Sequence, residues 1–490
     1  MALRFPIENY KVRELNYKGE SLIIRAFEGI PYVEYPVAPE YQVLNLYVPE
    51  IYYKETEEKI DRKYDLHSAP IFMPNTVGGY MPGRAGVPEI FENGECNSIV
   101  KALYHGYVVV APGLRGRCMT NEAGEHIGIA PSDICDYKAV VRYLRYNKDL
   151  IAGNTERIIS NGTSAGGAMS ALLGATGNHP DYEEVLEEMG AVKERDDIFF
   201  ASCYCPIINL DHADMAYEWE FDGIKECHQM RYIPPKDKET NGPWQSVICS
   251  MSEEQIQWSK QLKELFPAYV EQLQLKNERG QLLSLIKESE EPWILVQEEA
   301  SSLLELVCIY VAKSAEEAIK KGKDLSELAW LKIENGKVVA IDYRAYIAYR
   351  TRMKDTPAFD KVWLGTPENE LFGNKTIFQR HFTEFSTECA KRTQIGAKEN
   401  KEHSMAEAIQ IKQMNPMYYI DDEKATKATY FRIRHGAIDR DTSLFIPLMF
   451  ATKLKNQGIS TDLAFPWETG HSGDYDLEEV FEFIDNMERK

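Results

Sequence analysis

The sequence predicts an α/β protein built around a mainly parallel sheet. Stretches of strand length alternate along the chain with stretches of helical period. Residues 107–113 and 198–206 are apolar almost throughout, as is typical of strands in a parallel sheet covered on both faces. A third observation lies at residues 158–169, where an apolar pair, a glycine-rich turn and a helix-forming run follow one another directly.

The first part of the chain supplies further strands and a helix before this turn. Alternation of apolar and polar residues predicts antiparallel strands at the start of the sheet. In chain order, the expected elements are strands at 21–27 and 42–49, a short apolar strand at 69–74, and a helix at 132–144 that is amphipathic and capped by its first serine.

The pattern changes after residue 206. Residues 207–427 are charged and mostly of helical period, most clearly at 255–273 and 292–321. Asn335-Gly336, between two strand-like runs, predicts a hairpin with a type I′ turn. Because the α/β pattern resumes afterwards, we interpret this block as an insertion into the sheet-forming part.

The last part of the chain returns to strands and helices. It is expected to contain strands at 428–434 and 461–465 and helices at 442–457 and 477–489. The predicted division is therefore a first part of the core at 1–206, an insertion domain at 207–427 and a last part of the core at 428–490.

Composition excludes several function classes. The 490 residues carry a formal net charge of −21, which disfavours binding to nucleic-acid backbones or anionic membranes. No apolar stretch reaches membrane-spanning length. The N-terminal residues turn polar at once, so no signal peptide is predicted.

The nine cysteines indicate a reducing, cytoplasmic setting, because they are scattered and odd in number. Cys203 and Cys205 are close together, but their spacing matches no zinc pattern, and we interpret them as small core residues on one face of a strand. No metal site is predicted.

The glycine-rich turn has the form Gly-x-Ser-x-Gly, from Gly162 to Gly166, with Ser164 at its centre. Between a strand and a helix, this pattern is typical of a nucleophile elbow, in which the serine has a strained backbone and its neighbours must lack bulk. The alternative is an ordinary glycine-rich turn with an incidental serine.

A serine nucleophile needs a base and an acid that orients the base. In α/β-hydrolases the chain order is serine, acid, histidine, and Asp439 and His471 follow two predicted strands in that order. Asp441 is the rival acid, although it could equally cap the helix expected from residue 442. We prefer Asp439 because it leaves the strand through a shorter turn.

The oxyanion of the tetrahedral intermediate needs two hydrogen-bond donors. One is expected from the backbone N–H of Ala165, directly after the nucleophile. The other is expected from Gly78 or Gly79, in the loop after the strand at 69–74. The alternative for the glycine pair is a plain tight turn.

Four stretches together resemble one family, the bacterial tannases of subtype B, which are α/β-hydrolases that cleave gallic acid esters. The stretches are Gly-Gly-Tyr-Met-Pro-Gly at 78–83, Gly-Thr-Ser-Ala-Gly-Gly at 162–167, Arg-His-Gly-Ala-Ile-Asp-Arg-Asp-Thr-Ser at 434–443, and Gly-His-Ser-Gly at 470–473. The third is the most specific. The resemblance covers most of the chain and implies an α/β-hydrolase fold with a large, mostly helical lid inserted before the acid-bearing strand.

The resemblance also implies residues that bind the phenolic hydroxyls of the galloyl ring: Lys354, Glu368 and Asp441. Carboxylates accept hydrogen bonds from phenols, and an ammonium favours an ionised phenol. Taken without the resemblance, Lys354 could simply complement the C-terminus of a helix at 343–353. Glu368 could belong to an ordinary helix start after Thr366 and Pro367.

The implied function is a serine esterase that takes a small phenolic ester and needs no cofactor. A feruloyl or other aryl esterase on the same fold is the first alternative, and a non-catalytic binding protein of the hydrolase fold is the second. Disulfide-linked relatives, the fungal tannases and many feruloyl esterases, carry cysteines beside the catalytic serine and histidine. Here the neighbours are Thr163, Ala165, Gly470 and Ser472. No oligomeric state is predicted.

Overall fold

The computed structural model describes residues 3–54, 63–232, 244–286, 292–393 and 404–487. Within these residues, the main sheet has the order β1-β2-β3-β5-β4-β6-β7-β13-β14. The strands from β5 to β14 run parallel, whereas β1, β2 and β3 are antiparallel to their neighbours. The bounds are β1 Lys11–Tyr17, β2 Glu20–Pro31, β3 Val43–Pro49, β4 Pro70–Pro74, β5 Val108–Pro112, β6 Asn154–Thr163, β7 Phe200–Tyr204, β13 Tyr430–Arg434 and β14 Ser460–Ala464. The predicted class is confirmed.

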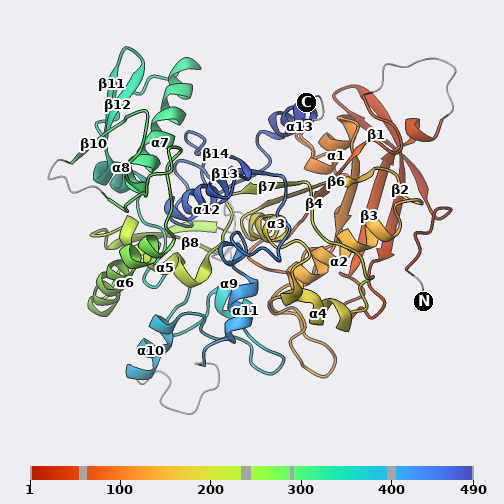
Figure 1. Cartoon of the computed structure of the whole chain (residues 1–490), viewed down its shortest axis with the longest axis horizontal. Coiled ribbons are helices and arrows are strands. Elements are labelled where there is room, and N and C mark those ends of the chain that lie inside the picture. Colours follow the sequence, from red (N-terminus) through yellow and green to blue (C-terminus); the bar gives the residue numbers. More distant parts are fainter. Residues whose placement is uncertain (1–2, 55–62, 233–243, 287–291, 394–403, 488–490) are drawn as a thin grey trace, which may run out of the picture.

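Helices cover both faces of this sheet (Figure 1). α1 and α13 pack together on one face, and α2 and α3 lie on the other. Strands β4, β5 and β7 are buried at every position between these layers, which explains why their sequences lack polar alternation. The bounds are α1 Ser98–Tyr104, α2 Ser132–Tyr146, α3 Ala165–Ala175, α4 Glu183–Glu188, α12 Phe445–Asn456 and α13 Leu477–Met487.

A long excursion separates β7 from β13, although the two strands pair directly in the sheet. Its elements are seen at the left and bottom of Figure 1. They are α5 Leu210–Glu220, β8 Glu226–Tyr232, β9 Trp244–Ser250, α6 Glu253–Gln272, β10 Trp293–Leu295, α7 Leu303–Lys320, β11 Leu331–Glu334, β12 Lys337–Asp342, α8 Tyr343–Arg350, α9 Pro367–Leu371, α10 Glu384–Arg392 and α11 Ala408–Gln413. The division of the chain at residues 206 and 427 stays a prediction.

The hairpin predicted at Asn335-Gly336 is confirmed. These two residues connect β11 and β12 with positive φ angles of 51° and 75°, as a type I′ turn requires. The third strand of this small sheet corrects a prediction, because 292–321 is not one helix. β10 pairs with β12, and α7 starts only at Leu303 after the cap Ser302.

The helix predicted at 132–144 is present as α2, but it is not capped by Ser132 and it has no solvent-facing side. Pro131 is the N-cap residue, and almost the whole helix is buried. Its charged side chains are paired inside the protein instead of facing water: Lys138 and Arg142 both contact the buried carboxylate of Asp196. The charged residues of this stretch therefore did not identify a side of the helix that faces solvent.

Two helix ends near the candidate site differ from the predictions. The helix expected at 343–353 is α8 and ends at Arg350, and the helix expected at 442–457 is α12 and starts at Phe445. The last predicted helix is α13, whose expected end at Arg489 lies outside the described residues.

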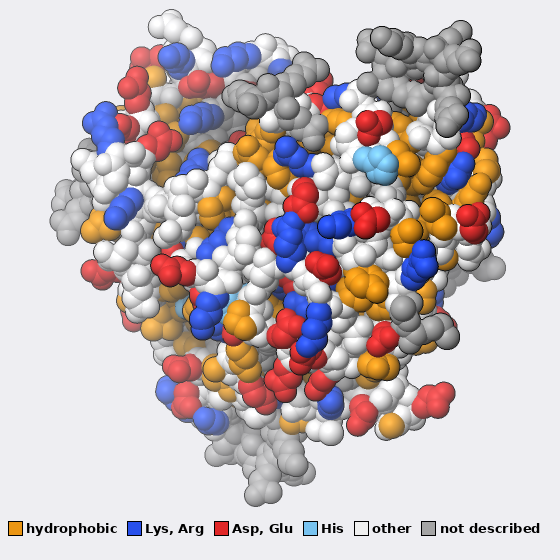
Figure 2. All heavy atoms as spheres, turned by 45° about the vertical axis from the view of Figure 1, so that its right-hand side comes forward, with side chains coloured by type: hydrophobic (Ala, Val, Ile, Leu, Met, Phe, Trp, Pro, Cys, Tyr) orange, Lys and Arg blue, Asp and Glu red, His pale blue; other side chains and the backbone are white. Residues whose placement is uncertain are grey.

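On the face shown in Figure 2, acidic and basic side chains are interspersed.

Candidate active site

Ser164 lies at a sharp turn between β6 and α3. Its backbone has φ 61° and ψ −122°, a strained conformation for a residue with a side chain. The neighbouring glycines are required by close packing: a Cβ on Gly162 would lie 2.3 Å from the carbonyl oxygen of Gly166, and one on Gly167 would lie 2.4 Å from that of Tyr204. The predicted elbow conformation is therefore present, and an ordinary turn does not describe it.

Asp439 and His471 follow β13 and β14, which are parallel neighbours. The two loops are joined by a backbone hydrogen bond from the N–H of Ile438 to the carbonyl oxygen of Thr469, at 3.1 Å. Gly436 packs so closely that a Cβ would lie 2.0 Å from the same oxygen. This packing brings residues 32 positions apart to one edge of the sheet.

A chain of hydrogen bonds connects Ser164, His471 and Asp439. The Nε2 atom of His471 lies 2.8 Å from the Oγ of Ser164, and its Nδ1 lies 2.9 Å from the Oδ2 of Asp439. The other carboxylate oxygen, Oδ1, accepts a hydrogen bond from the N–H of Asp441 at 2.9 Å. Such an arrangement fixes the imidazole in the orientation in which Nε2 faces the serine.

The electrostatics of the pair match this orientation. Burial by itself would lower the pKa of His471, but the hydrogen bond and the charge of Asp439 outweigh it and raise the pKa. Burial would raise the pKa of Asp439, yet the nearby His435 and the bond to His471 hold it well below its usual value. Asp439 is therefore held as a carboxylate beside the imidazole ring.

Asp441, the rival acid, lies farther from the histidine. Its Oδ2 is 3.6 Å from Nδ1 of His471, beyond hydrogen-bond distance. It does not cap α12 either, because the N-cap residue of that helix is Leu444. Asp441 instead pairs with Lys354, whose Nζ lies 3.6 Å from its Oδ1.

Lys354 and Glu368 come from the excursion between β7 and β13. Lys354 lies beyond the end of α8, so it does not complement that helix, and its Nζ is 4.0 Å from the centre of the Phe359 ring. Glu368 does belong to a helix start, α9, which has a capping box at Thr366. Burial raises the pKa of Glu368, and the charge of Lys354 opposes this rise. The structure thus pairs Lys354 with Asp441, and the charge of Lys354 also acts on Glu368.

The backbone N–H groups predicted to bind an oxyanion lie near the elbow. Ala165 is the first residue of α3, and the loop after β4 packs on this helix, since a Cβ on Gly166 would lie 2.9 Å from the carbonyl oxygen of Val77. Gly78 accepts a hydrogen bond from the N–H of Met81, which closes a turn through Gly79.

A cavity of about 510 Å³ borders the histidine and both aspartates. Its lining also includes the segment that follows α8. The residues are Tyr349, Arg350, Thr351, Met353, Ile438, Asp439, Arg440, Asp441, Gly470 and His471.

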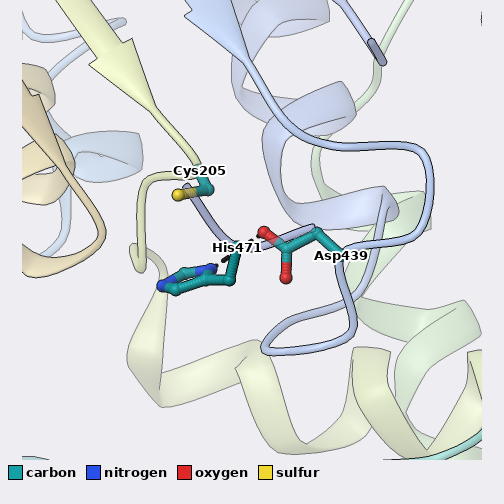
Figure 3. Close-up of side chains that lie close together, drawn as sticks. All are labelled: Cys205, Asp439 and His471. Carbon is teal, nitrogen blue, oxygen red and sulfur yellow. Dashed lines mark hydrogen bonds and ion pairs between the residues drawn. The ribbon is translucent and has the colours of Figure 1, made fainter. Parts of the chain in front are cut away.

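Three residues near the site were missed by the sequence analysis. Cys205 is buried, as predicted, but it does not lie on the strand: it follows the end of β7 with φ 34°, and Figure 3 shows its side chain beside His471. Arg117 donates a hydrogen bond from Nε to the carbonyl oxygen of Gly79 at 2.6 Å. His435 is fully buried, with Nδ1 3.7 Å from the Oδ2 of Asp439. Cys205 and His435 stood in stretches that had been singled out, whereas Arg117 did not.

Solved structures similar to this chain cover nearly its whole length. A tannase of Fusobacterium nucleatum is 43% identical over 99% of both chains, with a TM-score of 0.89. A tannase from Lactobacillus plantarum is 38% identical over 99% of this chain and 98% of that one, with a TM-score of 0.88. The chain belongs to the tannase family. A tannin acyl hydrolase in complex with ethyl gallate, 38% identical over 99% of this chain and 98% of that one, has a TM-score of 0.85.

Two further comparisons agree with this tannase-family assignment. A family profile described as BD-FAE matches residues 84–205. Esterase LipC of Mycobacterium tuberculosis is 41% identical over 58 residues, which are 12% of this chain and 14% of that relative. The protein is a carboxylic ester hydrolase of the α/β-hydrolase fold. None of the helices in the described ranges has the length and apolar character needed to cross a membrane.

Proposed function

We propose that the protein is a serine esterase that hydrolyses galloyl esters to gallic acid and an alcohol. The observation that supports this most is the hydrogen-bonded chain from Ser164 to Asp439, with the Lys354–Asp441 ion pair directly beside it. The first feature suits acyl transfer and the second suits a phenolic ring. The ethyl gallate bound to a relative has the same chemistry.

In the proposed mechanism, the Oγ of Ser164 attacks the ester carbonyl while Nε2 of His471 takes the serine proton. Asp439 holds the ring and stabilises the imidazolium. The N–H of Ala165 and that of Gly78 or Gly79 donate hydrogen bonds to the oxyanion. The imidazolium then protonates the leaving alcohol. Water hydrolyses the acyl-enzyme through the same groups.

The ring site is proposed to use Lys354, Glu368 and Asp441. The carboxylates accept hydrogen bonds from the phenolic hydroxyls, and the ammonium of Lys354 favours a polarised or ionised phenol. A site built around hydroxyl groups rejects analogues that lack them by roughly 10⁴-fold or more. The excursion that carries Lys354 and Glu368 would then act as a lid that keeps water from the acyl-enzyme.

We also place the protein in the cytoplasm. The nine cysteines are scattered along the chain and odd in number, which fits a reducing compartment.

The decisive test compares the release of acid from methyl gallate and methyl ferulate by the wild type and by Ser164→Ala. We expect strong gallate hydrolysis that disappears in the variant, because the nucleophile is lost. Preference for ferulate would retain the serine mechanism and overturn the ring site. Activity that survives in Ser164→Ala would overturn the mechanism itself.

A further inference from the structure

Cys205 has no part in the proposed mechanism, yet its side chain lies beside that of the histidine (Figure 3). It is the first residue after β7, and its N–H donates a hydrogen bond to the carbonyl oxygen of Arg434 at 2.6 Å. The Sγ lies 3.5 Å from the carbonyl oxygen of Ser472, next to His471. The thiol is therefore held between the strands that carry the other site residues.

Three kinds of metal ligand converge at this point. One ligand atom each of Cys205, Asp439 and His471, namely a sulfur, a carboxylate oxygen and a ring nitrogen, all lie within 4.8 Å of one another. Bond lengths to zinc of about 2.0–2.3 Å put tetrahedral ligand atoms about 3.3–3.6 Å apart. Side-chain movements of roughly 1 Å would therefore bring the three atoms onto one ion.

We propose that Cys205, His471 and Asp439 form an inhibitory binding site for a soft divalent cation such as Zn²⁺ or Cd²⁺. The mixture of sulfur, nitrogen and oxygen ligands selects these ions, whereas Mg²⁺ and Ca²⁺ prefer oxygen ligands alone. The ion takes part in no step of ester hydrolysis and acts as a regulator or poison of the enzyme.

Inhibition follows from the ligands that the ion occupies. A cation bound to Nε2 prevents that atom from taking the proton of Ser164. A cation bound to Nδ1 replaces the hydrogen bond to Asp439. A cation beside the ring also disfavours the imidazolium that forms during acyl transfer. This consequence rests on the proposed function of His471, but the binding of the ion does not.

The test measures inhibition by Zn²⁺ with a simple ester, p-nitrophenyl acetate, so the galloyl assignment does not enter. We expect Zn²⁺ to inhibit the wild type and Mg²⁺ to leave it active. Removing a residue that only hydrogen-bonds a metal ligand already weakens metal binding by about 10–100-fold. Cys205→Ser removes a direct ligand, so it should raise the Zn²⁺ concentration for half inhibition by at least about 10-fold. Each variant is compared with its own activity without metal.

The matched control is Cys118→Ser. Cys118 is the exposed cysteine, and its Sγ lies 3.0 Å from a carboxylate oxygen of Glu370, so it is the rival zinc ligand in this region. We expect this variant to be inhibited like the wild type. Relief of inhibition by Cys118→Ser, or equal inhibition of Cys205→Ser and wild type, would overturn the proposal.

A second readout does not depend on activity. Co²⁺ is added to the inactive Ser164→Ala protein and the near-ultraviolet absorption of a thiolate–cobalt bond is followed. We expect the band in Ser164→Ala and its loss in the double variant with Cys205→Ser. An unchanged band in the double variant would place the ion elsewhere, even if the proposed esterase activity proved wrong.

Discussion

The guanidinium of Arg117 is hydrogen-bonded to the carbonyl oxygen of Gly79, at 2.6 Å from Nε. The same guanidinium forms an ion pair with Glu370 of α9, the helix that carries Glu368. Arg117 therefore ties the loop of the proposed oxyanion donors to the helix of a proposed ring ligand. Because the carbonyl group of Gly79 is held, the plane of the peptide bond that joins Gly79 to the next residue is fixed as well.

We predict that Arg117→Met lowers kcat for methyl gallate and for phenyl acetate by similar factors. The loop would no longer be held in place, and loss of a whole oxyanion donor costs about 10²–10³-fold, which sets the upper limit. Steady-state kinetics of both esters provide the measurement. A matched variant, Glu370→Gln, keeps the Arg117–Gly79 bond and should lose less. A rise in KM alone, at constant kcat, would argue against this role.

Lys354 is predicted to matter only for phenolic substrates. A hydrogen bond to a charged group contributes about 1.5–3 kcal/mol, so Lys354→Met should lower kcat/KM for methyl gallate by about 10–150-fold. Methyl benzoate, which has no phenolic hydroxyl, serves as the control substrate and should be affected much less. Equal losses on the two esters would show that Lys354 supports the fold of the site instead of the ring.

The sequence was sufficient to predict the positions of residues that depend on local geometry. Ser164 was found because a strained turn needs glycines at fixed neighbouring positions, and Asp439 and His471 were found because parallel strands place their following loops at one edge. These constraints act within a few residues of each strand end, so they leave a pattern in the chain.

Contacts between distant segments left no such pattern. The bond from Arg117 to Glu370 joins residues 253 positions apart. Cys205 has a positive φ directly after β7, a backbone change that the apolar run at 198–206 does not reveal. Likewise, the charged residues of α2 suggested a side that faces solvent. In the structure they pair with Asp196, a buried residue of another segment, which the local pattern could not reveal.

Gly436 is predicted to be irreplaceable because of packing. A Cβ there would lie 2.0 Å from the carbonyl oxygen of Thr469, whereas Gly470, in the partner loop, has nothing within 4 Å of its Cβ position. Neither glycine has a positive φ, so the comparison isolates steric contact. We expect Gly436→Ala to separate the loops of Asp439 and His471 and to lose most activity.

The matched variant Gly470→Ala should keep the fold and most of the activity. Thermal unfolding and the rate of methyl gallate hydrolysis are measured for both proteins. Overpacking typically costs about 1–3 kcal/mol, which would be visible as a lower Tm for Gly436→Ala only. If Gly470→Ala were as damaging as Gly436→Ala, a general intolerance of side chains in these loops would be the better explanation.

Asp196 is predicted to make the stability of the fold sensitive to acid. Its carboxylate accepts hydrogen bonds from Lys138 Nζ and Arg142 Nε, both at 2.8 Å. Burial alone would raise the pKa of Asp196, but these two cations outweigh it and lower the pKa. An unfolded aspartate has a pKa of about 3.9, so the folded state binds this proton less readily than the unfolded state.

Stability from this group is consequently complete above the unfolded pKa and is lost as the pH falls through the folded pKa. Asp196→Asn removes the carboxylate partner of the buried Lys138 and leaves Arg142 with Glu183, so it should destabilise the protein at pH 7 by about 3–5 kcal/mol. Its urea midpoint should also fall less steeply than that of the wild type below about pH 4. Glu388→Gln, which removes an exposed ion pair with Lys391, should behave like the wild type. A wild-type acid dependence in Asp196→Asn would mean that other carboxylates govern acid unfolding.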